Sequence, residues 1–97
     1  MTKKDIVDTV AEETGLQRKE VQITLEAAIE KIIKSVCKDD PVTLRGFGTF
    51  RSVLRKKKLA RDITRKTTVE IPERYVVKFV PSDDFSEQLN YYKNKKK

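Results

Sequence analysis

Residues 42–53 read VTLRGFGTFRSV, a pattern typical of two short strands around a tight reversal. Val42 and Leu44 alternate with polar residues, and an extended pattern resumes after residue 48. Gly46 and Gly48 flank Phe47, and glycine on both sides of an aromatic residue suits a sharp turn that leaves the ring on the buried side. The stretch therefore predicts an antiparallel strand pair.

The residues before this stretch predict a helical hairpin. Thr2 with Asp5 three residues later is a good helix start, and Gly15 is a good end. A longer helix is expected from about residue 18 to residue 38, where apolar residues recur at spacings of three and four, and Pro41 follows its end. The short link after Gly15 should let the two apolar faces pack together.

The residues after it predict a basic hairpin and a last helix. Residues 51–66, RSVLRKKKLARDITRK, contain eight basic residues and one acid, so this segment carries a charge equal to the net +7 of the chain. Residues 67–81 are rich in β-branched residues and should return as the partner strand, with the turn near residues 63–66. The hairpin's outer half has too few apolar residues to cover either face, so we expect it to project and to be mobile until something holds it. Ser82 should cap a short helix, with a frayed basic tail after Asn90.

The composition limits the class of protein. The chain has 97 residues, which suggests one domain over residues 1–97, with an arm at about 54–72 and a basic tail at 93–97. No apolar run is long enough for a membrane span and no secretory leader is evident, so we expect a protein that is neither membrane-bound nor exported. Cys37 is alone and histidine is absent, which leaves no intrachain disulfide and none of the usual zinc sets. We expect Cys37 to behave as a small apolar residue without a chemical role.

A localised cationic segment indicates a polyanionic partner. The long helix also carries a wider apolar stripe than one short helix can cover, and the sheet needs a lid. A symmetric second copy would bury both surfaces.

The order of these motifs resembles the bacterial histone-like HU and integration host factor family. The resemblance rests on GFGTF at 46–50, EIP at 70–72 and the F-x-P at 79–81, and it covers residues 1 to about 90 without an insertion or deletion. Arg45 before GFG, and RYVVKF at 74–79, are more similar to integration host factor than to HU. The resemblance implies an α+β fold with an N-terminal helical hairpin, a three-stranded antiparallel sheet with a long β-ribbon arm, a short C-terminal helix, and an intertwined dimer.

The resemblance also implies a function, that of an architectural protein which binds duplex DNA through the minor groove with paired basic β-arms and bends and compacts it with little or modest sequence preference. It further implies partners and a set of residues. The expected partners are double-stranded DNA and a second copy of the chain or a paralogous subunit, with no cofactor, metal, membrane or small-molecule substrate. The expected place of action is the cytoplasm, on the nucleoid. Phe47, Phe50 and Phe79 are expected in the dimer core. The candidate DNA-binding residues are Lys3, Arg45, Gly46, Arg51, Arg55, Lys56, Lys57, Lys58, Arg61, Ile63, Arg65, Lys66 and Arg74.

Two positions depart from the family pattern. Ile63 stands at the arm tip where the family has a proline that wedges between base pairs; isoleucine can also act as a wedge, or it can make a contact across the hairpin. Asp83 and Asp84 stand at the start of the last helix, where family members commonly place a lysine near phosphate. We therefore expect no phosphate contact there.

Several alternatives stay open at this point. Lys3, Lys4, Arg18 and Lys19 are either phosphate contacts or ordinary surface residues, and Arg45 either reaches a base edge or only flanks the sheet. A binder of RNA or single strands would place aromatic residues among the basic ones, but Tyr75, Tyr91 and Tyr92 lie outside the basic segment. An enzyme is the weakest class, since no catalytic set or phosphate-binding loop is found.

Overall fold

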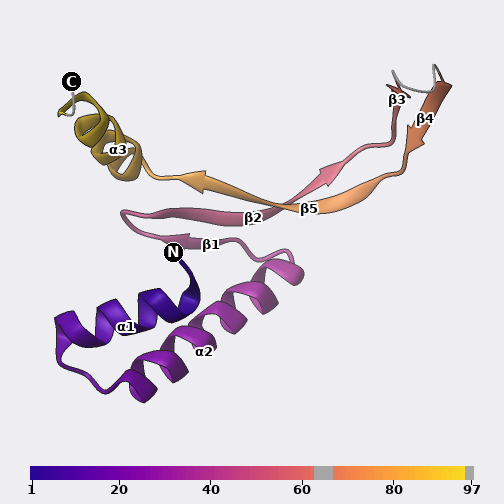
Figure 1. Cartoon of the computed structure of the whole chain (residues 1–97). Coiled ribbons are helices and arrows are strands. Elements are labelled where there is room, and N and C mark those ends of the chain that lie inside the picture. The colour runs from indigo at the N-terminus through magenta and orange to yellow at the C-terminus, as the bar shows by residue number, and fades with distance from the viewer. Residues whose placement is uncertain (63–66, 96–97) are drawn as a thin grey trace. The chain divides into compact units, whose positions relative to one another are not determined.

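The computed structural model describes residues 1–62 and 67–95 of the chain. Its elements, in chain order, are α1 (Lys3–Thr14), α2 (Arg18–Cys37), β1 (Val42–Leu44), β2 (Gly48–Arg55), β3 (Lys58–Asp62), β4 (Thr67–Ile71), β5 (Arg74–Pro81) and α3 (Asp83–Lys95) (Figure 1). The chain divides into two compact units, residues 1–35 and 36–97. No helix within the described ranges combines the length and apolar character that a membrane span requires.

The first unit is the predicted helical hairpin. Thr2 caps α1 in a capping box with Asp5, in which each side chain accepts a hydrogen bond from the other residue's backbone N–H. Gly15 ends the helix in the left-handed conformation, with φ of 75°, and donates its N–H to the Ala11 carbonyl. Val7 of α1 and Val21 of α2 are buried. Both boundaries of α1 are thus confirmed.

Ion pairs also join α1 to α2. Lys3 Nζ lies 3.5 Å from Glu26 Oε2, and Arg18 pairs with Asp8. All four side chains are exposed to water, so each pair contributes about 1 kcal/mol or less to stability. The burial of the two valines therefore stabilises the hairpin more than its charges do.

One chain leaves much of the apolar stripe of α2 uncovered. Ile23 is 59% exposed and Ile33 is 56% exposed. In addition, Ile6, Val10 and Leu16 are among the residues that line an apolar hollow of about 330 Å³ between the helices. These surfaces are too apolar to remain in water at no cost, as the sequence predicted for a chain that needs a second copy.

The second unit contains a three-stranded antiparallel sheet in the order β1–β2–β5. The reversal between β1 and β2 is closed by a hydrogen bond from the Phe47 N–H to the Leu44 carbonyl, at 2.9 Å. Gly46 has φ of 83°, which favours glycine at this turn position. The turn predicted from the two glycines around Phe47 is confirmed.

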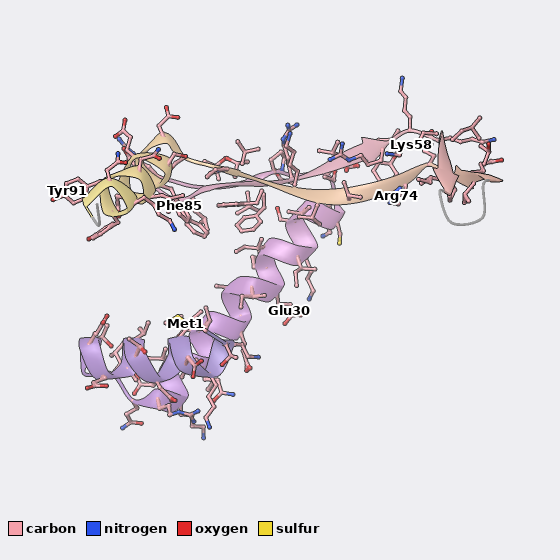
Figure 2. All side chains as sticks on the ribbon, turned by 45° about the horizontal axis from the view of Figure 1, so that its top comes forward. Met1, Glu30, Lys58, Arg74, Phe85 and Tyr91 are labelled. Carbon is pink, nitrogen blue, oxygen red and sulfur yellow. The ribbon has the colours of Figure 1, made fainter. Side chains whose placement is uncertain are left out.

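Four phenylalanine rings form a cluster in this unit, and two of them remain exposed in the single chain, Phe47 by 42% and Phe85 by 38%. The Phe50 and Phe79 rings, opposite each other on β2 and β5, have centroids 4.8 Å apart. The Phe47 ring centroid lies 5.1 Å from that of Phe79 and 5.6 Å from that of Phe85 of α3. Phe85 is labelled in Figure 2. Such aromatic pairs contribute about 0.5–1.5 kcal/mol each beyond the area that they bury. The cluster holds α3 against the sheet.

The arm differs from the continuous hairpin that the sequence suggested. β3 and β4 form a separate two-stranded sheet, and in Figure 1 they continue from the end of the β2–β5 pair far from α3. Arg55 lies opposite Arg74 and Lys58 opposite Ile71, so residues 56–57 face residues 72–73 across the break and the register is kept. Pro72 has no N–H to donate, which explains why the ladder stops there.

Two smaller expectations were wrong. α3 continues to Lys95, so the chain is helical well past Asn90 and residues 91–95 are not frayed. Cys37, at the last position of α2, is exposed and not packed as an apolar residue. The expected turn at residues 63–66 lies outside the described residues, as do the last two residues of the tail.

Candidate nucleic-acid interface

The alternation of side chains along β2 and β5 sorts basic residues onto one face of the sheet. Arg51 lies opposite Lys78 and Arg55 lies opposite Arg74, and in an antiparallel pair directly opposite residues point to the same face. All four side chains are exposed. Two of the predicted residues from β2 and one from β5 thus share one cationic face, which we call the basic face.

The basic face carries an unfavourable charge arrangement. Like charges directly opposite each other on neighbouring strands destabilise a sheet, yet this face has two such pairs, separated by Val53 opposite Val76. The described residues give none of the four a carboxylate salt-bridge partner within 4.0 Å. A line of phosphates would relieve the repulsion, so the arrangement suits a polyanion.

The opposite face of the same sheet is apolar. Phe50 and Phe79 lie on it near α3, and Tyr75 and Val77 lie on it toward the arm, exposed by 70% and 69%. Tyr75 therefore does not interleave with the arginines of β2 and β5. A stacking platform for unpaired bases, which needs aromatic rings among cations, is not formed on the basic face.

The break between the sheets holds three lysines in a row. Lys56 and Lys58 are exposed, and Figure 2 labels Lys58. Lys57 Nζ lies 2.7 Å from Glu70 Oε1 of β4. Glu70 therefore pairs with one of the three lysines that the sequence analysis proposed as DNA contacts. Farther out, Arg61 lies opposite Thr68 in the arm ladder. Ile63, Arg65 and Lys66 are outside the described residues.

The remaining candidates have different surroundings. Lys3 pairs with Glu26, and with Lys4 and Arg18 it lines a hollow of about 330 Å³ at the first unit's surface. Arg45 is exposed in the turn after β1. Gly46 lies in the same turn but shares a hollow with Asp84 and Glu87 of α3. Acids beside Gly46 do not favour a phosphate at that position.

Sequence reasoning missed Lys78. Lys78 lies between the apolar Val77 and Phe79 and was not among the candidates. The signal was available: Lys78 has the opposite parity from Phe79, so it must face away from the aromatic core. In the described residues no three potential metal-ligating side chains come together, and no metal or cofactor site is assigned.

The family model described as "Bacterial DNA-binding protein" matches residues 1–90. The chain belongs to this family. Its members include the HU proteins and the integration host factor subunits, so the family predicted from GFGTF, EIP and F-x-P is confirmed. The family is one of architectural DNA-binding proteins and not a class of enzymes.

Individual relatives agree along nearly the full chain. DNA-binding protein HU of Thermotoga maritima is 34% identical over 91 residues, which are 92% of this chain and 99% of the relative. The integration host factor subunit beta of Thioalkalivibrio sulfidiphilus is 28% identical over 91 residues, 93% of this chain and 95% of that subunit. The resemblance of residues 45 and 74–79 to integration host factor thus does not extend to a higher identity over the whole chain.

A solved structure also matches the fold. The HU chain of an Anabaena HU–DNA cocrystal structure has a TM-score of 0.84 and 38% identity, and the match covers 92% of this chain and 97% of that chain. That HU protein was therefore crystallised with DNA. The predicted α+β fold, with its helical hairpin, antiparallel sheet, arm and C-terminal helix, is confirmed.

Proposed function

We propose that this protein is an architectural protein of duplex DNA, which it binds as a dimer through the basic faces and the basic arms of two subunits. The observation that carries the proposal is the pair of like-charge ladders, Arg51 with Lys78 and Arg55 with Arg74, on a face that carries no aromatic ring. A structural role does not account for four cations placed in mutual repulsion. A phosphate backbone does.

The second subunit is required by the apolar surface as well as by the family. The exposed isoleucines of α2 and the phenylalanine cluster offer two surfaces that a copy of the chain, or a paralogous subunit, would cover. Phe47, Phe50 and Phe79 are the proposed core residues of that interface. A dimer also supplies two arms, and two arms can hold one duplex from both sides.

The proposed mechanism combines charge with deformation. The arms enter the minor groove, and the cations of the break and the arm neutralise phosphates, each releasing condensed counterions. Ile63 at each tip would partly unstack one base step at a cost of about a few kcal/mol, which further phosphate contacts repay as the duplex bends. Such contacts read the backbone and its deformability, so little sequence preference is expected.

The candidate DNA contacts beyond the basic face differ in how free their charged groups are to reach a phosphate. Lys56 and Lys58 are exposed beside the face, while Lys57 must first leave Glu70. Arg61, Arg65 and Lys66 extend the positive charge along the arm in the sequence. Arg45 lies in the turn at the other end, and Lys3 is held by Glu26. The proposal includes no catalytic activity, and it places the protein on the bacterial nucleoid in the cytoplasm.

The test is the salt dependence of binding to several unrelated duplexes, with single strands of the same sequences as competitors. We expect affinity to fall by about 10³-fold or more between about 50 and about 200 mM salt, the behaviour of six or more phosphate contacts. Duplex should compete better than single strand. Affinity that is flat with salt, or single strands that compete equally well, would refute the function.

The wedge has a separate test. Ile63→Ala should lower the bend angle, measured by energy transfer between the duplex ends, more than it lowers affinity, because the methyl groups that hold a base step open are gone. An unchanged bend angle would remove Ile63 from the mechanism and leave phosphate binding intact.

A further inference from the structure

Two acids of α3 lie against the turn that follows β1. Asp84 and Glu87 line a hollow of about 500 Å³ together with Gly46, one of the residues that the sequence assigned to DNA. The hollow also borders Tyr91 and Tyr92. Both acids are exposed, so they act on whatever approaches the turn.

Hydrogen bonds hold this acidic surface in place. The Ser82 N–H donates to the Phe47 carbonyl at 2.9 Å, which ties the start of α3 to the turn. Ser82 Oγ in turn accepts from the Phe85 N–H at 3.1 Å and caps the helix. The Phe85 ring is 5.6 Å from Phe47. The backbone that carries the carboxylates therefore cannot move away from the turn without breaking the cap and the aromatic contact.

The sign of the charge differs between the turn and the start of α3. Arg45 precedes the turn, whereas the first two turns of α3 contain Asp83, Asp84 and Glu87 and no basic residue. The helix dipole is favourable to the first two acids, so they suit the helix start, but the three together repel a phosphate. A duplex lying on the basic face would make no further favourable phosphate contacts by extending past Arg45 toward α3.

Taking the proposed function as given, we propose that the acidic start of α3 ends the DNA contact on each subunit. The duplex is held by the arms and the basic face and is not drawn along α3, so Gly46 is not a phosphate contact. The protein consequently grips a short segment of duplex. The number of phosphates that it neutralises does not grow when the DNA is longer than that segment.

The experiment compares salt slopes on two duplex lengths, about two and about four helical turns (~20 and ~40 bp), by fluorescence anisotropy with the full chain. The slope of log affinity against log salt counts neutralised phosphates, and it is unaffected by how many overlapping sites a duplex offers. The test variant is Asp84→Asn/Glu87→Gln. The matched control is Glu12→Gln/Glu13→Gln, which changes the net charge equally at exposed positions near the end of α1.

The unmodified protein should give the same slope on both duplexes. The α3 variant should bind the long duplex about fivefold more tightly and with a steeper slope, while its binding to the short duplex matches that of the control. A slope that already rises with length in the unmodified protein, or an α3 variant that behaves like the control on both duplexes, would overturn this proposal. If the unmodified protein and both variants all bound DNA with an affinity that does not depend on salt, the DNA function itself would be refuted.

Discussion

Replacing Lys78 by glutamine should stabilise the free protein and weaken its DNA complex. Lys78 lies directly opposite Arg51, where Cβ atoms are about 5 Å apart. Two unit charges about 6 Å apart repel by about 0.7 kcal/mol in water, and a Debye length of about 10 Å at 0.1 M salt reduces this to about 0.4 kcal/mol. Glutamine keeps the length of the side chain and removes the charge.

The two effects are measured on the same samples. A gain of about 0.4 kcal/mol per subunit corresponds to a rise in melting temperature of about 2 °C at fixed protein concentration, and it should vanish near 1 M salt. The salt slope of DNA binding should fall by about 0.9 for each lost phosphate contact, or about 2 per dimer. Lys31→Gln, an exposed lysine of α2 in the other unit, is the control for net charge. If Lys78→Gln lowers both stability and affinity, or leaves the salt slope at the control value, the basic face has been assigned wrongly.

Substitutions at three further places test other parts of the structure. Thr2→Ala removes the cap of α1 and should lower the free energy of unfolding by about 1 kcal/mol, whereas an aspartate in Thr2→Asp should keep most of the cap's stabilisation. Equal melting temperatures for the unmodified protein, Thr2→Ala and Thr2→Asp would contradict the capping box. Glu70→Gln frees Lys57, so DNA affinity should rise and the salt slope of binding should steepen by up to about 0.9 per subunit. The free energy of unfolding should change by less than about 1 kcal/mol, because the ion pair is exposed. Weaker DNA binding would mean instead that the ion pair positions the arm. Gly48→Ala would place a Cβ 2.6 Å from the Phe79 ring and from the Val80 carbonyl oxygen, so it should lower the free energy of unfolding more than Gly46→Ala does. The Cβ of Gly46→Ala meets nothing within 4 Å, and its cost is only that of the positive φ, about 1–2 kcal/mol. The reverse order of stabilities in urea unfolding would refute the close approach at β2.

The order and type of the elements were predictable because each has a local signal. Thr2, Gly15 and Pro41 mark helix ends through capping and through the missing N–H of proline, and these effects act within a few residues. The turn at Gly46 likewise follows from a single backbone angle. Local rules therefore gave the helical hairpin and the first two strands.

The interruption of the arm was not predictable by the same reasoning. Residues 56–57 have no strand-breaking signal of their own, and their ladder ends because Pro72 comes opposite in the register. The pairing of Lys57 with Glu70 depends on the same register. Long-range pairing decides both features, and residue propensities do not contain it.

The candidate site was predicted by charge and refined by geometry. Counting basic residues found the arm and β2, but it could not separate Arg51 on the basic face from Lys57, which Glu70 holds. The count also missed Lys78, and the family resemblance placed Gly46 in the site without its acidic neighbours. Facing directions and neighbours across the fold are the information that the charge count lacks.

The most direct test of the basic face is a titration of the ¹⁵N-labelled protein with a short duplex, followed through the arginine Nε–Hε signals and the tyrosine rings. The signals of Arg51, Arg55 and Arg74 should shift together, return when salt is added, and leave the ring of Tyr75 unaffected, because that ring lies on the other face of the sheet. Unmoved arginine signals, with shifts at Tyr75 instead, would contradict the account.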